Sequence, residues 1–189
     1  MRAGRSVEGK ASTSRKRQAR RSKNARLMGA KRIGHGFALA AHPYIMAHMK
    51  KQNICLEVCP ISNEILGLTS RMKGHTTYSL LANDVHCTVN SDNGTLFRFV
   101  FPIFVLNPVT NSLRRSTLSH DFYQVMVGRA DMTLYGWRQL IEWSLQHACM
   151  SATEYADVYE HWKAAWEEFL AWLVETYGHV LNEEGGETD

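Results

Sequence analysis

The sequence predicts an α/β fold built on a parallel sheet, and two observations support this. Short, mostly apolar segments end at a glycine, a proline or a polar turn, as buried strands do, at residues 31–36, 53–62 and 85–97. Helix-forming segments separate these three strands along the chain. The order strand, helix, strand, helix, strand implies parallel βαβ units with right-handed crossovers.

Each intervening segment has a helical signature. The longest covers residues 38–52, and Pro43 marks its true first turn because proline has no N–H to satisfy. Pro60 is expected to stop the second strand. Two shorter helices are expected at residues 63–68 and 77–83.

The C-terminal part of the chain is predicted to be helical. Residues 133–150 place one apolar face along a helix, made by Leu134, Trp137, Leu140, Ile141, Leu145 and Ala148. Ser151 and Glu154 form a capping box, which opens a long helix to about Tyr177. This helix carries an apolar stripe that is largely aromatic, a pattern typical of a packing surface. Its members are Tyr155, Val158, Tyr159, Trp162, Trp166, Phe169, Leu170 and Leu173. Gly178 suits its end, and residues 179–189 are expected to form an acidic tail.

Charge is divided unevenly along the 189 residues, although the net charge is only +4. Residues 1–32 hold 12 of the 22 Lys and Arg and a single acid, Glu8. Residues 33–189 therefore hold 10 basic and 17 acidic side chains, a net charge of −7. Residues 1–23 therefore read as a basic, disordered leader before a domain at 24–178. Nothing downstream looks like a nucleic-acid module, so no nucleic-acid partner is expected.

The cysteines and the apolar segments exclude other classes. Four cysteines do not make a disulfide framework, and Cys55 and Cys59 lie in an apolar run without zinc-knuckle spacing, so buried thiols are expected. No segment reaches the roughly 18 apolar residues of a membrane span, and the N-terminus lacks the apolar core of a signal peptide.

Two polar residues stand where chemistry would collect in a parallel α/β fold. His35 follows the first strand between Gly34 and Gly36, which lets a backbone or ligand approach closely, and Asp92 follows the third. Both could face one pocket, with Asp92 as a metal ligand and His35 acting on a metal-bound water. Taken alone, a turn histidine and a helix-capping aspartate explain the same residues.

Residues 99–114, FVFPIFVLNPVTNSLR, fit neither neighbour. Joining Arg98 to Arg115 would give a connection of ordinary strand-to-helix length. The segment is interpreted as translated intron, with an unusual lid as the alternative.

Four motifs in this order resemble the C-terminal part of adenosine deaminases, in particular the adenosine deaminase-related growth factor branch with its fungal members. They are KRIGHGFAL, LEVCPISN, VNSDNGTLF and LSHDFYQVMVG. The resemblance runs from about Asn24 to the final helix, apart from the insert. It implies a partial (β/α)8 TIM barrel, consisting of the last three strand–helix units, with C-terminal helices.

The resemblance also implies zinc-dependent deamination of adenosine or 2′-deoxyadenosine to the inosine product and ammonia. Asp92 matches a zinc ligand, and His35 matches the histidine that orients and helps to deprotonate the zinc-bound water. Asn93 stands where many relatives carry an aspartate that contacts the purine, and its amide can make one hydrogen bond there without a charge. Gly94 replaces a proline common in relatives.

The chain lacks two family motifs, His-x-His and His-Ala-Gly-Glu, which supply three zinc-ligand histidines and the catalytic glutamate. We therefore expect a C-terminal fragment that is inactive by itself, explained by a gene model that starts late and retains an intron, or by a true truncation. The alternative is a non-catalytic half-barrel scaffold with a polyanion-binding leader. Localisation and oligomeric state stay open: relatives are often secreted, and a homo-oligomer is compatible with the sequence.

Overall fold

The structure of the protein is a computed structural model that describes residues 20, 24, 29–69, 71–92 and 118–184. The chain divides into two units, residues 1–147 and residues 148–189. Most of the predicted leader and all of the predicted insert at 99–114 lie outside the described residues.

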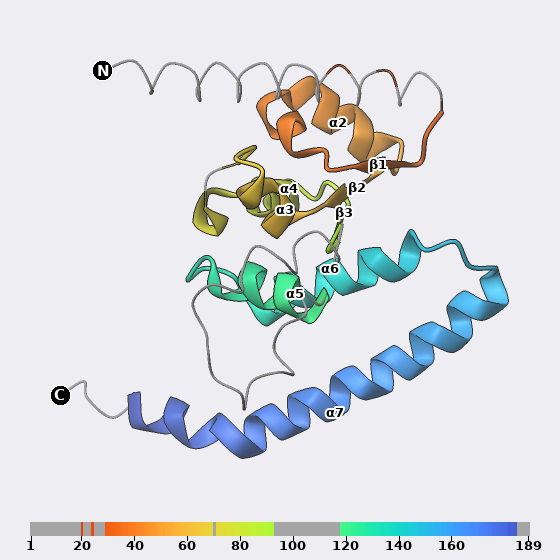
Figure 1. The fold of residues 1–189 in the computed structure, drawn as a ribbon. Helices are drawn as coiled ribbons and strands as arrows, with labels where there is room; N and C mark the ends of the chain where they lie inside the picture. Colours follow the sequence, from red (N-terminus) through yellow and green to blue (C-terminus); the bar gives the residue numbers. More distant parts are fainter. Residues whose placement is uncertain (1–19, 21–23, 25–28, 70, 93–117, 185–189) are drawn as a thin grey trace, which may run out of the picture. The chain divides into compact units, whose positions relative to one another are not determined.

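The first unit contains a parallel sheet of three strands in the order β1-β2-β3 (Figure 1). The strands are β1 (Arg32–Gly34), β2 (Cys55–Val58) and β3 (Cys87–Val89). Both pairs are parallel, with Ile33 beside Leu56 and Leu56 beside Cys87. The predicted parallel sheet is confirmed, and three parallel strands with intervening helices are consistent with part of a TIM-type fold.

Helices connect the strands in the predicted order: η1 (Phe37–Ala41), α2 (Pro43–Lys51), α3 (Pro60–Ile65), η2 (Met72–Gly74) and α4 (Thr77–Ala82). After the third strand come α5 (Leu118–Val127) and α6 (Leu134–Gln146). Pro43 begins α2, as predicted. The helix expected at 63–68 starts earlier, at Pro60, because proline at the first helical position loses no hydrogen bond and already has a helical φ.

One face of the sheet is apolar and forms the core of the first unit. Ile33, Leu56, Val58, Cys87 and Val89 are buried, and they belong to one cluster with residues of the surrounding helices, namely Met49, Leu80, Val125, Leu140 and Trp143. The register explains this face, because neighbouring residues in parallel strands point to the same side. Trp143 of α6, which was not in the predicted apolar face, is 2% exposed and packs in this core.

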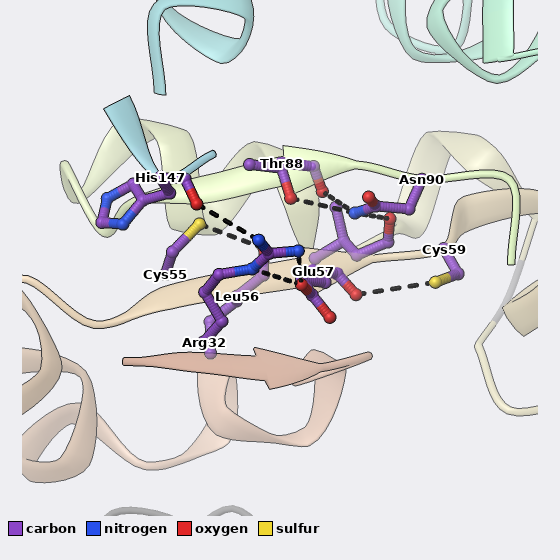
Figure 2. A network of polar contacts seen from close by, with 9 residues as sticks. Arg32, Cys55, Leu56, Glu57, Cys59, Thr88, Asn90 and His147 are labelled. Atoms are coloured by element: carbon purple, nitrogen blue, oxygen red, sulfur yellow. Dashed lines mark hydrogen bonds and ion pairs between the residues drawn. The ribbon is translucent and has the colours of Figure 1, made fainter. Parts of the chain in front are cut away.

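The opposite face of the sheet carries polar side chains (Figure 2). Arg32 forms an ion pair with Glu57, and its guanidinium also donates to the carbonyl of His147 at 3.2 Å. On the neighbouring strand, the Asn90 amide donates to Thr88 Oγ1 at 2.9 Å. The Arg32 and Glu57 side chains are partly exposed, and their charges are paired with each other on this face.

The second unit is dominated by α7 (Ala152–Glu184). Its predicted capping box is confirmed: Ser151 N–H donates to Glu154 Oε2 at 2.8 Å, and Glu154 N–H donates to Ser151 Oγ at 3.3 Å. The aromatic stripe forms a ladder of neighbouring rings from Tyr155 to Trp172.

The predicted helix end at Gly178 is wrong, because α7 continues to Glu184 and takes in the first part of the predicted tail. Gly178 has no left-handed backbone there, and a glycine inside a helix costs only about 1 kcal/mol. Among the described helices, none combines the length and the apolar character that crossing a membrane requires.

Candidate metal and proton-transfer site

The structure brings His35 and Asp92 together at the carboxyl edge of the sheet. His35 follows β1 and Asp92 lies just beyond β3, and His35 Nε2 is 3.8 Å from Asp92 Oδ2. Both side chains are about one-third exposed, so a ligand can reach them. This is the juxtaposition that the sequence predicted from strand order.

Both residues have a left-handed backbone. The φ angle is 63° at His35 and 55° at Asp92, a region that costs free energy for residues other than glycine, less for aspartate than for most. Such conformations persist where the surrounding structure imposes them, and they concentrate at functional sites. The His35 N–H is held by the carbonyl of Glu57 at 2.8 Å.

Only one of the two glycines beside His35 is required by space. A Cβ atom at Gly36 would lie 2.9–3.1 Å from the Leu56 side chain, and the φ of Gly36 is 57°. A Cβ atom at Gly34 would meet nothing closer than Glu57 Oε2, at 3.8 Å. The close approach predicted for both glycines therefore holds for Gly36, where the chain turns back over β2.

Asp92 is held by a hydrogen bond from the start of α3. Ser62 Oγ donates to Asp92 Oδ2 at 2.8 Å, and Ser62 is 1% exposed. The residues from Pro60 onward turn into a helix directly after β2, so Ser62 reaches across the carboxyl edge to the end of β3. The carboxylate thus has one oxygen anchored from the neighbouring strand–helix unit.

A third potential ligand atom lies in the same place. His35, Cys59 and Asp92 offer ligand atoms that all lie within 4.8 Å of one another. Burial, with Asp92 and other nearby carboxylates, raises the pKa of Cys59 to about 12, and its thiol donates to the Glu57 carbonyl at 3.5 Å. Cys59 is therefore a protonated, buried thiol, as the sequence predicted for Cys55 and Cys59.

The donor set can be compared with what zinc accepts. Zinc binds carboxylate oxygen, imidazole nitrogen and thiolate sulfur, and a catalytic site combines three protein ligands with a water. Asp92 supplies a carboxylate anchored in place, with the His35 imidazole beside it. These residues fit one side of a zinc site.

Three further polar residues extend from His35 into the protein. His35 Nδ1 lies 2.9 Å from Asn63 Oδ1, and Asn63 Nδ2 lies 3.0 Å from His75 Nε2. His75 Nδ1 lies 2.7 Å from Thr77 Oγ1 and accepts the Thr77 backbone N–H at 3.2 Å. Asn63, His75 and Thr77 are at most 3% exposed, and burial lowers the pKa of His75 to about 4.

Sequence reasoning missed this chain of residues. Asn63 stands within the LEVCPISN motif but carries no signal of its own, and His75 and Thr77 flank the start of α4 without any recognised spacing. The only signal in the sequence that could have pointed to these residues is that His75 and Thr77 lie at the start of the short helix α4.

A buried carboxylate lies nearby on α5. Asp121 is 1% exposed, and neither carboxylate oxygen accepts a hydrogen bond of ordinary geometry from the described residues. Burial raises the pKa of Asp121 to about 6, and the backbone of Ile61 partly offsets this rise. Asp121 also helps to raise the pKa of Cys59, so the two side chains share one environment. Asn93, the predicted substrate contact, lies outside the described residues.

Fold and site together define a parallel α/β chain with zinc-type donors at the carboxyl edge of its sheet. The family model described as adenosine deaminase matches residues 22–101. An adenosine deaminase of Phlebotomus duboscqi is 37% identical over 145 residues, which are 76% of this chain and 25% of that protein. Adenosine deaminase 2 of Homo sapiens is 32% identical over 150 residues, 78% of this chain and 26% of that protein.

The chain belongs to the adenosine deaminase family. It spans about a quarter of the length of the relatives it matches. The family match covers β1, β2 and β3 together with His35 and Asp92.

Proposed function

We propose that this chain supplies the C-terminal strand–helix units of a zinc-dependent adenosine deaminase, which converts adenosine and water to inosine and ammonia. The observation that carries the proposal is the 3.8 Å approach of His35 and Asp92 within the segment that matches the family. Relatives that bear the name adenosine deaminase support the substrate class.

Each residue takes the role that its position allows. Asp92 provides a zinc ligand, with its carboxylate held by Ser62. His35 faces the same place and orients the attacking water, with which it can exchange a proton. Zinc, when bound, would lower the pKa of that water and so favour its attack at neutral pH. Asn93 would contact the purine through its amide, in adenosine or in 2′-deoxyadenosine.

The sheet supports the assignment to part of a closed barrel. Its polar face carries the Arg32–Glu57 ion pair and the Thr88–Asn90 hydrogen bond, groups that suit an interior shared with further strands (Figure 2). The three parallel strands in the described part of the chain leave two open sheet edges. We therefore propose that the 189-residue chain needs the remaining strand–helix units to form the barrel.

The same reasoning predicts no deamination by the 189-residue chain alone. It contributes Asp92 as a single family zinc ligand and contains neither a His-x-His pair nor a His-Ala-Gly-Glu segment. Several protein ligands are needed to hold catalytic zinc, and a general acid is needed to protonate the purine.

A chimera tests the proposal. Residues 22–184 of this chain would replace the corresponding segment of the Phlebotomus duboscqi relative, which supplies the rest of the protein. We expect zinc-dependent formation of inosine by the chimera and none by the 189-residue chain. His35→Ala and Asp92→Ala should each lower the rate by at least about a hundredfold.

Matched controls are available on α7, where His161→Ala and Asp157→Ala remove the same side-chain types from exposed positions. These controls should retain the rate of the unmodified chimera. Unchanged turnover in both His35→Ala and Asp92→Ala would contradict the site assignment.

The uneven charge of the chain favours one other candidate, a non-catalytic half-barrel scaffold that binds polyanions through its basic leader, residues 1–23. Its affinity for a polyanion such as heparin should fall steeply between about 50 and 200 mM salt. A truncated chain that starts at residue 29 should then lose this affinity, and binding that survives the truncation would contradict the scaffold.

A further inference from the structure

We infer that Thr77, His75 and Asn63 form a directional hydrogen-bond relay that places the proton of neutral His35 on Nε2, the ring nitrogen facing Asp92. The inference deepens the role given to His35 and rests on the proposed function for its catalytic meaning. The relay itself is a property of this chain and can be measured without catalysis.

The direction of the relay is set at the start of α4. Thr77 is the first residue of α4, where a backbone N–H has no acceptor within the helix. This N–H donates to His75 Nδ1 at 3.2 Å. A backbone N–H can only donate, so Nδ1 of His75 is an acceptor and carries no proton. The Thr77 hydroxyl, 2.7 Å from the same nitrogen, can donate to it as well.

His75 is neutral, because its burial opposes the charged form. A neutral imidazole with an unprotonated Nδ1 carries its proton on Nε2. Among the described residues, the side chain hydrogen-bonded to His75 Nε2 is the amide of Asn63, at 3.0 Å. The His75 Nε2–H therefore has to donate to the amide oxygen.

The Asn63 amide can meet this requirement. Its two terminal atoms make contacts of nearly equal length: Oδ1 lies 2.9 Å from His35 Nδ1, and Nδ2 lies 3.0 Å from His75 Nε2. A half-turn of the amide exchanges oxygen and nitrogen at unchanged positions, and the hydrogen-bond network decides between the two orientations. Asn63 is fully buried, so its amide oxygen needs a hydrogen-bond donor and its NH₂ group needs an acceptor. With the oxygen toward His75, the NH₂ group donates to His35 Nδ1.

His35 then accepts at Nδ1 and, when neutral, carries its proton on Nε2. Nε2 lies 3.8 Å from Asp92 Oδ2, and a positively polarised hydrogen on this nitrogen is favourable beside a carboxylate. Before the reaction, His35 would therefore orient the oxygen of the attacking water beside Asp92 by donating a hydrogen bond to it. It has no lone pair at Nε2 until its proton moves to Nδ1, which requires Asn63 to turn. Asn63, His75 and Thr77 act as positioning residues.

Nitrogen-15 NMR of the imidazole rings tests the relay directly, because protonated and unprotonated ring nitrogens resonate far apart. The 189-residue chain, labelled at histidine, would be measured at about pH 8, where histidine is neutral. We expect the Nε2–H tautomer for both His35 and His75. An Nδ1–H tautomer at His35 would overturn the inference.

Asn63→Asp gives the sharpest variant. A carboxylate has the shape of the amide but only accepts hydrogen bonds, so His35 should move its proton to Nδ1 while His75 keeps Nε2–H. Asn83→Asp makes the same change at an exposed end of α4, where the amide donates to Ser79, and should alter neither ring. Thr77→Val keeps the backbone N–H, so both tautomers should stay as in the unmodified chain.

The outcomes separate the relay from the proposed function. A folded Asn63→Asp chain with an unchanged His35 tautomer would overturn the relay, whatever the chimera does. If Asn63→Asp fails to fold, the spectra of the unmodified chain and of Thr77→Val still decide. In an active chimera, Asn63→Asp should lower kcat on the order of a hundredfold with little change in KM. An inactive chimera with the expected tautomers would contradict only the proposed function.

Discussion

Ser62 Oγ donates a 2.8 Å hydrogen bond to Asp92 Oδ2, which joins the start of α3 to the end of β3. The same carboxylate oxygen is the one nearest to His35 Nε2. Ser62 of α3, the short helix after β2, thus fixes the orientation of the Asp92 carboxylate, which lies just beyond β3. The site depends on contacts between strand–helix units as much as on the strand ends themselves.

The first prediction concerns this bond. Ser62→Ala removes the hydroxyl that holds the carboxylate, so the zinc affinity of the chimera should fall about 10- to 100-fold. Competition with a zinc chelator measures the change. Ser79→Ala, at an exposed position on α4, should leave the affinity unaltered, and equal affinities for the two variants would show that Ser62 does not position Asp92.

The second prediction compares the two glycines beside His35. Gly36→Ala forces a side chain onto a φ of 57° and brings its Cβ within 2.9–3.1 Å of Leu56, so it should lower the free energy of unfolding by about 2 kcal/mol or more. Gly34→Ala meets ordinary contact at 3.8 Å and should cost much less. Urea unfolding of both variants measures the difference, and equal losses would contradict the close approach at Gly36.

The third prediction concerns His75 and acid. Burial lowers the pKa of His75 from 6.5 to about 4, so between these values the unfolded chain binds the extra proton. The contribution of His75 to the free energy of unfolding should therefore fall by about 3 kcal/mol as the pH drops from 6.5 to 4. His75→Gln should remove this contribution, which urea titrations at several pH values would detect. A variant with the same pH dependence as the unmodified chain would contradict it.

The fourth prediction concerns Asp121, for which the sign is opposite. Burial raises its pKa from 3.8 to about 6, so in this interval the folded chain holds the extra proton. Its contribution to stability is full at acid pH and is lost as the pH rises through 6, by about 3 kcal/mol. Asp121→Asn should therefore flatten the decline in stability toward pH 7, whereas Asp157→Asn, at an exposed position, should not.

These two residues nearly offset each other between pH 4 and 6. The unmodified chain should show little net pH dependence from the pair, and each single variant should reveal the slope of the other. Parallel slopes in the two variants would show that one of the two directions is wrong.

Much of the fold was predictable from local pattern. Short apolar segments with strand-ending residues predicted the three strands, and the capping box at Ser151 predicted the start of α7. The end of α7 was not predictable from Gly178, because a single glycine inside a helix costs only about 1 kcal/mol and the residues on both sides of it continue the helix. α3 began earlier than expected because Pro60 both ends a strand and opens a helix.

The site was predictable only in part. His35 and Asp92 follow strands, and strand order alone places strand ends at one edge. Asn63, His75 and Thr77 come together through loop geometry and burial, which leave no periodic trace in the sequence. The same applies to Asp121, which is distinguished by its surroundings rather than by a motif.

The left-handed backbone at His35 and Asp92 links the chemistry of the chain to its evolution. Glycine at either position, or asparagine at position 92, would relieve backbone strain. A substitution that removes the His35 or Asp92 side chain can therefore raise the free energy of unfolding. Selection for a well-folded chain and selection for a working site therefore pull these two positions in opposite directions. If the chain serves the proposed deamination, a lineage that no longer needs this activity should lose His35 and Asp92 early, while the apolar face of the sheet persists.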